Sequence, residues 1–285
     1  MSRKFFGLVG VLILTLACGL SGPATPEQAG VETIVAATFE ALTASAPTAP
    51  SGTPVSFQNI SFVIPEGLAS GATSELIPAT DESVGGPWGV TPQYISFTLT
   101  DYTGRQENYL KAVVNVYPAS EYASVNSWAG SSLTRLQALL ASPATPLTND
   151  NLPTVPFNGA AAQQYAAQAK FIPFNGGNGV SMISQYSQFP GPILKDNSFY
   201  HYEGLTSDGK YFVAALFPVN LPLQSTAENP NADGIIHPND ISDTASLTAY
   251  YQGITDKLNA SSPDSFQPSL NLLDALIKSI TVNTP

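Results

Sequence analysis

The feature that most limits the possible folds is the dipeptide Asp208-Gly209, which lies between two aromatic-rich runs, 199–207 and 210–219. Asp-Gly readily adopts the positive φ angles that a two-residue hairpin turn needs, and the flanking runs have the composition of strands. This segment therefore predicts an antiparallel hairpin at the centre of a sheet, because the second run is apolar on both of its faces.

A two-residue turn also fixes the register of this hairpin. Counted outward from the turn, His201 lies opposite Leu216, and Tyr202 lies opposite Ala215. One face then carries Tyr200, Tyr202 and Tyr211, and the other carries His201 and Glu203.

The remaining elements are predicted from periodicity and from turn residues. Strands are expected at 57–64, 94–101, 110–117, 165–174, 180–186 and 280–282, and helices at 120–140 (interrupted at Gly130), 247–258 and 270–277. Hairpins and helices that are grouped rather than alternating predict an α+β fold, a twisted and mainly antiparallel sheet of about seven strands with helices packed on one side. This order, with a first strand that stops at Pro65 and a helix and strand at the end, resembles that of PsbP/Mog1-like sandwiches and implies a similar sandwich.

The N-terminus has the pattern of an export signal. Arg3 and Lys4 precede the apolar run 5–14, which is too short to span a bilayer. The following Leu14-Thr15-Leu16-Ala17-Cys18 resembles the lipobox of bacterial lipoproteins, with Thr15 where that family more often has Leu. The resemblance implies cleavage before Cys18, a diacylglyceryl group on its thiol and acylation of the new amino terminus. A free cysteine in an ordinary signal peptide or in a short anchor helix is the alternative.

The domain organisation is predicted from this export signal and from the composition of the segments that follow it. Residues 1–17 are the predicted signal peptide, and 18–45 form the lipidated N-terminus with a short helix. The Pro/Ser/Thr-rich segment 46–56 is expected to be an extended, solvated linker, and 57–285 a single globular domain.

Charge excludes several kinds of partner. Removal of residues 1–17 leaves 8 basic and 21 acidic residues, a net charge of about −13. Nucleic acid is therefore not expected as a partner, and an anionic membrane surface would repel the domain, so the lipid on Cys18 should supply the membrane affinity. Only 11% of the residues are charged, which is typical of a weakly charged, hydrogen-bonding surface.

The loop 229–240 is similar to an EF-hand or dockerin calcium loop. That pattern would make Asn229, Asn231, Asp233 and Asp240 ligands, with the carbonyl of Ile235 and with Gly234 at the sharp turn. Asn229 stands at the first position of the loop, where the pattern has Asp, and Asp240 stands at the twelfth position, where it usually has Glu. A surface loop that matches by composition is the alternative.

Sequence motifs for enzymes are absent: the chain has no Gly-x-Ser-x-Gly, His-Glu-x-x-His, P-loop or Gly-x-Gly-x-x-Gly pattern. His201 and Glu203 could form a proton-transfer pair or a packed strand pair. Tyr200, Tyr202 and Tyr211 could stack a ligand or fill the core. No catalytic, metal or cofactor-binding residue is therefore assigned, and Cys18 is the only assigned site.

The function predicted from the sequence is a membrane-anchored, extracytoplasmic lipoprotein that acts as a binding or interaction module for an unknown ligand or protein. The alternatives are a cell-envelope polymer hydrolase and a structural domain stabilised by calcium through 229–240. A cleft or an exposed aromatic patch would favour binding, and a buried carboxyl facing a second one across a cleft would favour hydrolysis.

Overall fold

The computed structural model describes residues 51–81, 83, 89–105, 110–152 and 161–283. The predicted signal peptide, Cys18, the helix expected within 18–45 and the first part of the linker lie outside the described residues. The described residues belong to one compact unit.

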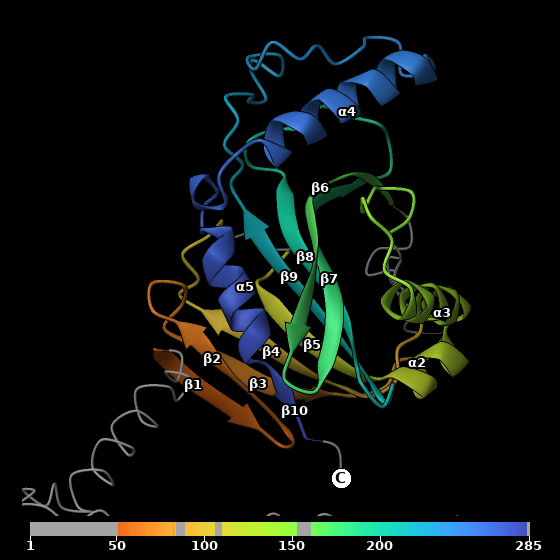
Figure 1. Ribbon diagram of the computed structural model, residues 1–285, viewed down its shortest axis with the longest axis vertical. Coiled ribbons are helices and arrows are strands. Elements are labelled where there is room, and N and C mark those ends of the chain that lie inside the picture. The colour runs from red at the N-terminus through yellow and green to blue at the C-terminus, as the bar shows by residue number, and fades with distance from the viewer. Residues whose placement is uncertain (1–50, 82, 84–88, 106–109, 153–160, 284–285) are drawn as a thin grey trace, which may run out of the picture. The chain divides into compact units, whose positions relative to one another are not determined.

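A seven-stranded, fully antiparallel sheet organises this unit, in the order β3-β4-β5-β9-β8-β7-β6 (Figure 1). Its strands are β3 (Gly71–Ile77), β4 (Tyr94–Thr100), β5 (Val113–Pro118), β6 (Ala162–Phe174), β7 (Gly177–Ser187), β8 (Ser198–Thr206) and β9 (Tyr211–Val219). The α+β class and the antiparallel sheet are confirmed.

The hairpin predicted around Asp208-Gly209 joins β8 and β9. Gly209 has a φ of 69°, and the paired residues include His201 with Leu216 and Tyr202 with Ala215, as the turn predicted. Every residue of β8 is buried, because the sheet has an apolar core on both of its faces.

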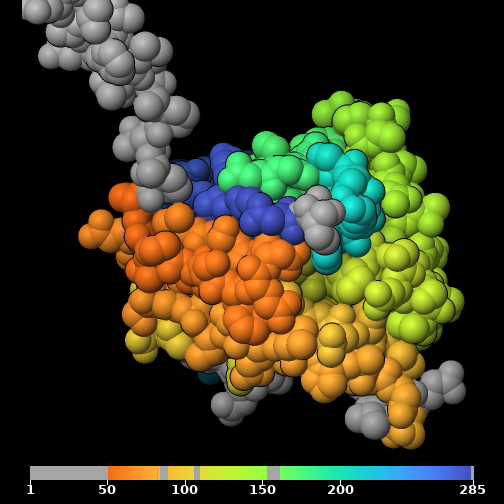
Figure 2. Space-filling model, turned by 90° about the horizontal axis from the view of Figure 1, so that it is seen from below, coloured from red at the N-terminus to blue at the C-terminus, as the bar shows by residue number. Residues whose placement is uncertain are grey.

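One face of the sheet packs against α4 (Thr244–Asn259), α5 (Leu270–Ser279) and a small sheet of order β1-β2-β10. The strands of this small sheet are β1 (Gly52–Phe57), β2 (Ile60–Pro65) and β10 (Thr281–Val282), and a 3-10 turn, η1, spans Pro263–Ser265. Figure 2 shows the result, with the first described residues beside the C-terminal segment. The two ends of the domain are therefore joined through β2.

The other face packs against α2 (Ala119–Val125) and α3 (Ser127–Ala141). The prediction placed all helices on one side of the sheet, whereas the helix predicted at 120–140 lies, as α2 and α3, on the face opposite α4 and α5. The predicted break lies at Asn126 and not at Gly130, because the Asn126 Oδ1 atom accepts from the backbone N–H groups of Trp128 and Ala129 and so caps a new helix. Gly130 lies inside α3, where a Cβ would be 3.0 Å from the Ala123 carbonyl oxygen of α2.

The start of the domain also differs from the prediction of one strand at 57–64. Phe57 ends β1, Gln58 turns the chain with a φ of 52°, and β2 begins at Ile60. Residues 52–56, which we assigned to the linker, are thus a strand. The proline content of 46–56 favoured a linker over a strand. Pro54 can nevertheless be accommodated in β1, because β1 is an edge strand and a position whose backbone N–H would face outward needs no hydrogen-bond partner.

Candidate functional site

His201 and Glu203 do lie on one face of β8, as predicted, and the imidazole Nε2 atom is 3.3 Å from a carboxylate oxygen of Glu203. Their side chains are 2% and 0% exposed. Burial lowers the pKa of His201 to about 3, so the imidazole is neutral near pH 7. The rings of Tyr186 and Phe199 lie beside it, which makes this a pair packed inside the domain rather than one open to a substrate.

The three tyrosines of the opposite face do not form a stacking platform. Tyr200 and Tyr202 are 1% and 0% exposed and belong to the core, and Tyr211 is partly buried against it. The Tyr200 hydroxyl donates to Asp274 Oδ1 of α5, and the Tyr202 hydroxyl donates to the Ile172 carbonyl. Core packing, the alternative that we gave for these residues, is correct.

Asp233, one of the predicted calcium ligands, has its carboxylate bound by other groups of the chain. Its carboxylate accepts from the backbone N–H groups of Gln224 and Ser225 and from the Ser225 hydroxyl, and it pairs with Lys257 Nζ at 2.9 Å. Burial raises the pKa of this carboxyl, but the hydrogen bonds from Ser225, Lys257 and Gln224 outweigh burial and lower it to about 2. We call these four residues the Asp233 cluster.

The other predicted ligands serve separate turns. Asn231 Oδ1 accepts from the His237 backbone N–H, and Asp240 Oδ1 accepts from the backbone N–H and hydroxyl of Ser242. Gly234 has the predicted positive φ, at 76°. The loop thus uses the residue types of a calcium site to hold its own backbone against α4.

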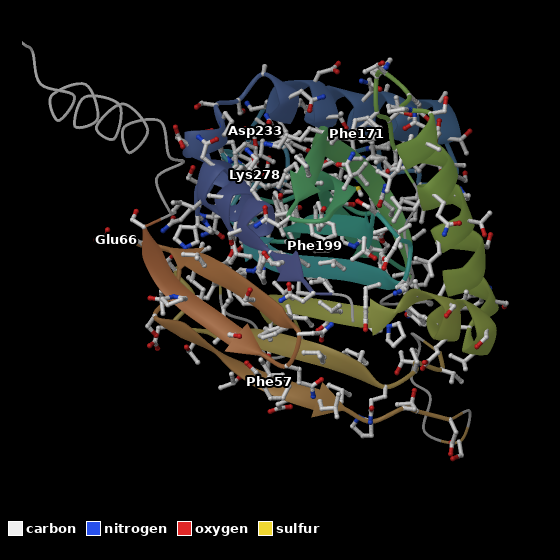
Figure 3. All side chains as sticks on the ribbon, turned by 60° about the horizontal axis from the view of Figure 1, so that its bottom comes forward. Phe57, Glu66, Phe171, Phe199, Asp233 and Lys278 are labelled. Carbon is white, nitrogen blue, oxygen red and sulfur yellow. The ribbon has the colours of Figure 1, made fainter. Side chains whose placement is uncertain are left out.

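A groove of about 690 Å³ lies where the 145–149 loop, β6 and α4 meet. Its lining residues are Thr145, Pro146, Leu147, Thr148, Asn149, Ala166, Gln168, Ala169, Lys170, Phe171, Gln252, Thr255 and Asn259. This volume is within the range of small-molecule sites, about 300 to 1,000 Å³. Figure 3 labels Phe171, which lies on β6 at this edge of the sheet.

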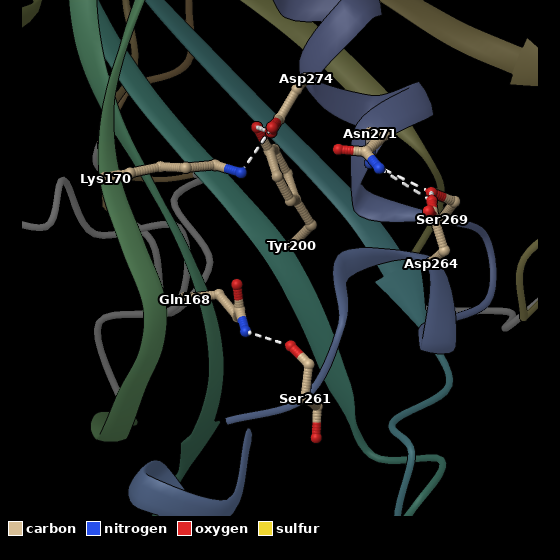
Figure 4. Close-up of polar contacts among 8 residues, drawn as sticks. All are labelled: Gln168, Lys170, Tyr200, Ser261, Asp264, Ser269, Asn271 and Asp274. Carbon is tan, nitrogen blue, oxygen red and sulfur yellow. Dashed lines mark hydrogen bonds and ion pairs between the residues drawn. The ribbon is translucent and has the colours of Figure 1, made fainter. Parts of the chain in front are cut away.

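A bulge in β6 gives the groove its shape. The pairing of β6 with β7 shifts between Ala167 and Lys170, and Gln168 there has a φ of 54°. The Gln168 Nε2 atom donates to the Leu258 carbonyl at 2.7 Å. It also donates to the Ser261 carbonyl at 3.0 Å (Figure 4). The bulge therefore caps the C-terminal end of α4 and fixes it beside the strand.

Lys170 is the only charged residue in this lining, and it is neutralised locally. Its Nζ atom pairs with Asp274 Oδ2, while Asp274 Oδ1 accepts from the Tyr200 hydroxyl (Figure 4). Since the Asp274 side chain is 9% exposed, the pair connects the groove to the core and leaves the floor of the groove without net charge.

The residues that line the groove were not predicted as site residues from the sequence. A signal was present on α4, where Gln252, Thr255 and Asn259 are spaced three and four apart and so share one helix face. The rest of the lining had none, because the loop, the bulge and the helix come together only in the folded chain.

No described helix combines the length and the apolarity that a bilayer crossing needs. Comparison with models of protein families, with curated proteins and with solved structures gives no match. The class that the structure defines is an α+β domain with a seven-stranded antiparallel sheet and a groove at one sheet edge that is lined by polar and apolar side chains.

Proposed function

We propose that the protein is an extracytoplasmic lipoprotein, anchored by lipid on Cys18, whose folded domain binds a ligand in the groove between the 145–149 loop, β6 and α4. The observation that carries the proposal is the groove itself: about 690 Å³, lined by both polar and apolar side chains from three separate segments, and without net charge. Concave sites with a few convergent polar groups are the usual places of ligand binding.

The hydrogen-bonding groups of the groove support binding. Within the part of the chain that the structure describes, Gln252 uses its Nε2 atom on Asp256, and Asn149 uses its Oδ1 atom on Gln163. This leaves Gln252 Oε1 and Asn149 Nδ2 for a ligand, together with the hydroxyl of Thr255.

Binding is favoured over hydrolysis by what the groove carries. Hydrolysis of a glycan polymer usually needs a pair of carboxylic side chains on opposite sides of the bond. The lining of the groove contains no Asp or Glu. Three described carboxyl side chains with little exposure, those of Glu203, Asp233 and Asp274, are paired with His201, Lys257 and Lys170, and none of the three carboxyls belongs to this lining.

The anchor is tested by replacement of Cys18. The full chain should partition with membranes, and a Cys18→Ser variant should appear in the soluble fraction, because only a thiol can form the thioether. A Cys18→Ser protein that remained entirely with membranes would rule out the lipid anchor.

The groove is tested by blocking it. A Thr255→Trp variant should lose ligand binding, because the indole would fill the space beside β6. The matched control is Thr248→Trp, an exposed position two turns earlier on α4 and outside the lining. Binding should be followed by saturation-transfer NMR against neutral oligosaccharides, uncharged peptides and acidic polymers. Loss in both variants, or in neither, would contradict binding in the groove.

A further inference from the structure

We infer that the ligand of this groove is a neutral saccharide chain, bound by hydrogen bonds from amide and hydroxyl side chains and by contact of a sugar face with Phe171. The inference rests on the proposed function and names the substrate class of the same site. Three properties of the lining carry it: its charge, its hydrogen-bonding groups and its apolar strip.

The charge of the groove disfavours ionic ligands. Lys170 is the one ionisable side chain in the lining, and its ammonium group is taken by Asp274. An acidic ligand would find no unpaired cation there, and a basic ligand would find no carboxylate. The whole chain carries a net charge of −11, which also opposes the approach of acidic polymers.

The hydrogen-bonding groups match a polyhydroxylated ligand. Three lining residues are threonines (Thr145, Thr148 and Thr255), and three more carry amides at exposed positions (Asn149, Gln252 and Asn259). A hydroxyl both donates and accepts, and each of these amides keeps one group that is not used within the described chain: Gln252 Oε1 as an acceptor, and the Nδ2 atoms of Asn149 and Asn259 as donors. Neighbouring sugar hydroxyls present the complementary pattern, so both partners of each contact can be satisfied.

The lining also contains apolar residues, which we call the apolar strip: Pro146, Leu147, Ala166, Ala169 and Phe171. Phe171 is partly exposed and packs against the core on the α2–α3 side of the sheet. The C–H face of a pyranose ring is apolar while its rim is polar, so a sugar can cover the Phe171 ring and keep its hydroxyls on the threonines and amides. Aromatic side chains serve this purpose because their faces are large and rigid.

An extended peptide is the competing occupant, because β6 is an edge strand and peptides often add to such edges. The structure opposes this. The Gln168 N–H, which an added strand would need, donates to Asn259 Oδ1 at 2.6 Å. Pro173, near the other end of β6, has no N–H. The bulge at 167–170 further interrupts the regular ladder that strand addition requires.

The test is calorimetric titration of the full chain in a zwitterionic detergent that has no sugar headgroup. The probes are cellohexaose and chitohexaose as neutral saccharides, hexagalacturonate as an acidic one, and an uncharged Ala/Thr decapeptide. At least one neutral saccharide should bind and the other two probes should not. Phe171→Ala should weaken that binding about tenfold, which corresponds to the ~1.4 kcal/mol expected of a lost aromatic contact.

Two controls keep the result interpretable. Phe189→Ala removes a phenylalanine that is 70% exposed and lies outside the lining, and it should leave binding unchanged. Phe171→Tyr keeps an aromatic ring and should retain binding. The melting temperature of Phe171→Ala shows whether a loss of binding in that variant comes from misfolding.

The outcomes separate the two proposals. If the decapeptide or hexagalacturonate binds and Thr255→Trp abolishes that binding, the groove is a ligand site but the saccharide inference is wrong. If none of the four probes binds the wild-type chain, the saccharide inference is overturned. The proposed ligand site is overturned separately if Thr255→Trp and its control Thr248→Trp have the same effect on ligand binding. Saccharide binding that Phe171→Ala does not weaken would contradict the assigned contact.

Discussion

The Asp233 cluster and the groove are built from similar polar side chains on and around α4, yet they serve different ends. In the Asp233 cluster the carboxylate is saturated by Gln224, Ser225 and Lys257, and its side chain is 1% exposed. In the groove, the amides and hydroxyls of α4 and of the 145–149 loop face an open space. Saturated polar groups stabilise the fold, whereas open ones are available to a ligand.

The largest effect is expected from breaking the Asp233 cluster. Asp233→Ala should lower the free energy of unfolding by about 2 to 3 kcal/mol, because it leaves the backbone N–H and hydroxyl of the buried Ser225 without their acceptor and removes the partner of the part-exposed Lys257 ammonium. Urea unfolding measures this. Asp196→Ala, at an exposed position, is the matched control and should change stability by less than about 0.5 kcal/mol. Equal effects would show that the cluster is not a structural lock.

Acid should destabilise the domain through the buried His201–Glu203 pair. The pKa of His201 is about 3 in the fold and about 6.5 when unfolded, so the unfolded chain takes up the proton first. Stability from this group is complete above pH 6.5 and should fall by roughly 2 kcal/mol between pH 7 and pH 5. Thermal unfolding across this range measures the loss, and His201→Gln should flatten it. Stability that is constant from pH 7 to pH 5 would contradict a buried neutral imidazole.

Gln168 joins the two kinds of region, because it caps α4 and also lines the groove. Gln168→Ala should cost about 1 to 2 kcal/mol of stability through the lost hydrogen bonds to the helix end. Hydrogen exchange should show faster opening at residues 256–261 in particular. An unchanged exchange rate there would mean that the bulge does not fix the helix.

The groove itself should matter little for stability. Gln252→Ala and Thr255→Ala should each change the free energy of unfolding by less than about 0.5 kcal/mol, because open polar groups are solvated in both states. Each variant should nevertheless weaken saccharide binding in the titration described above. A large destabilisation would place these residues with the Asp233 cluster instead.

Calcium should have the smallest effect. One millimolar calcium should leave the melting temperature unchanged, because Lys257 and the Ser225 and Gln224 donors already occupy the Asp233 carboxylate. Calorimetry with calcium provides a second readout. Heat of binding together with a higher melting temperature would instead support calcium binding by the 229–240 loop.

The comparison also explains what could be predicted from the sequence. The β8–β9 hairpin was predictable to the residue, because Asp208-Gly209 fixes a local turn and the register follows from it. The role of Asp233 was not, since residue types in 229–240 fit both calcium binding and internal hydrogen bonding. The difference comes from Lys257, which the fold brings in from α4.

The groove was beyond sequence reasoning for a similar reason. It needs the 145–149 loop, the β6 edge and one face of α4, which lie far apart in the chain. The groove depends on a bulge at Gln168, a non-glycine residue with a positive φ. No local sequence pattern predicts such a bulge. Only the polar stripe of α4 could have been noticed.

The central claim is that the open polar region, and not the saturated one, is the binding site. Amide chemical-shift mapping during a titration with the neutral saccharide that binds tests this most directly. The account predicts shifts that cluster at 145–149, 166–171 and 252–259, with the 229–240 loop unaffected. Shifts confined to 229–240, or spread evenly over the domain, would contradict it.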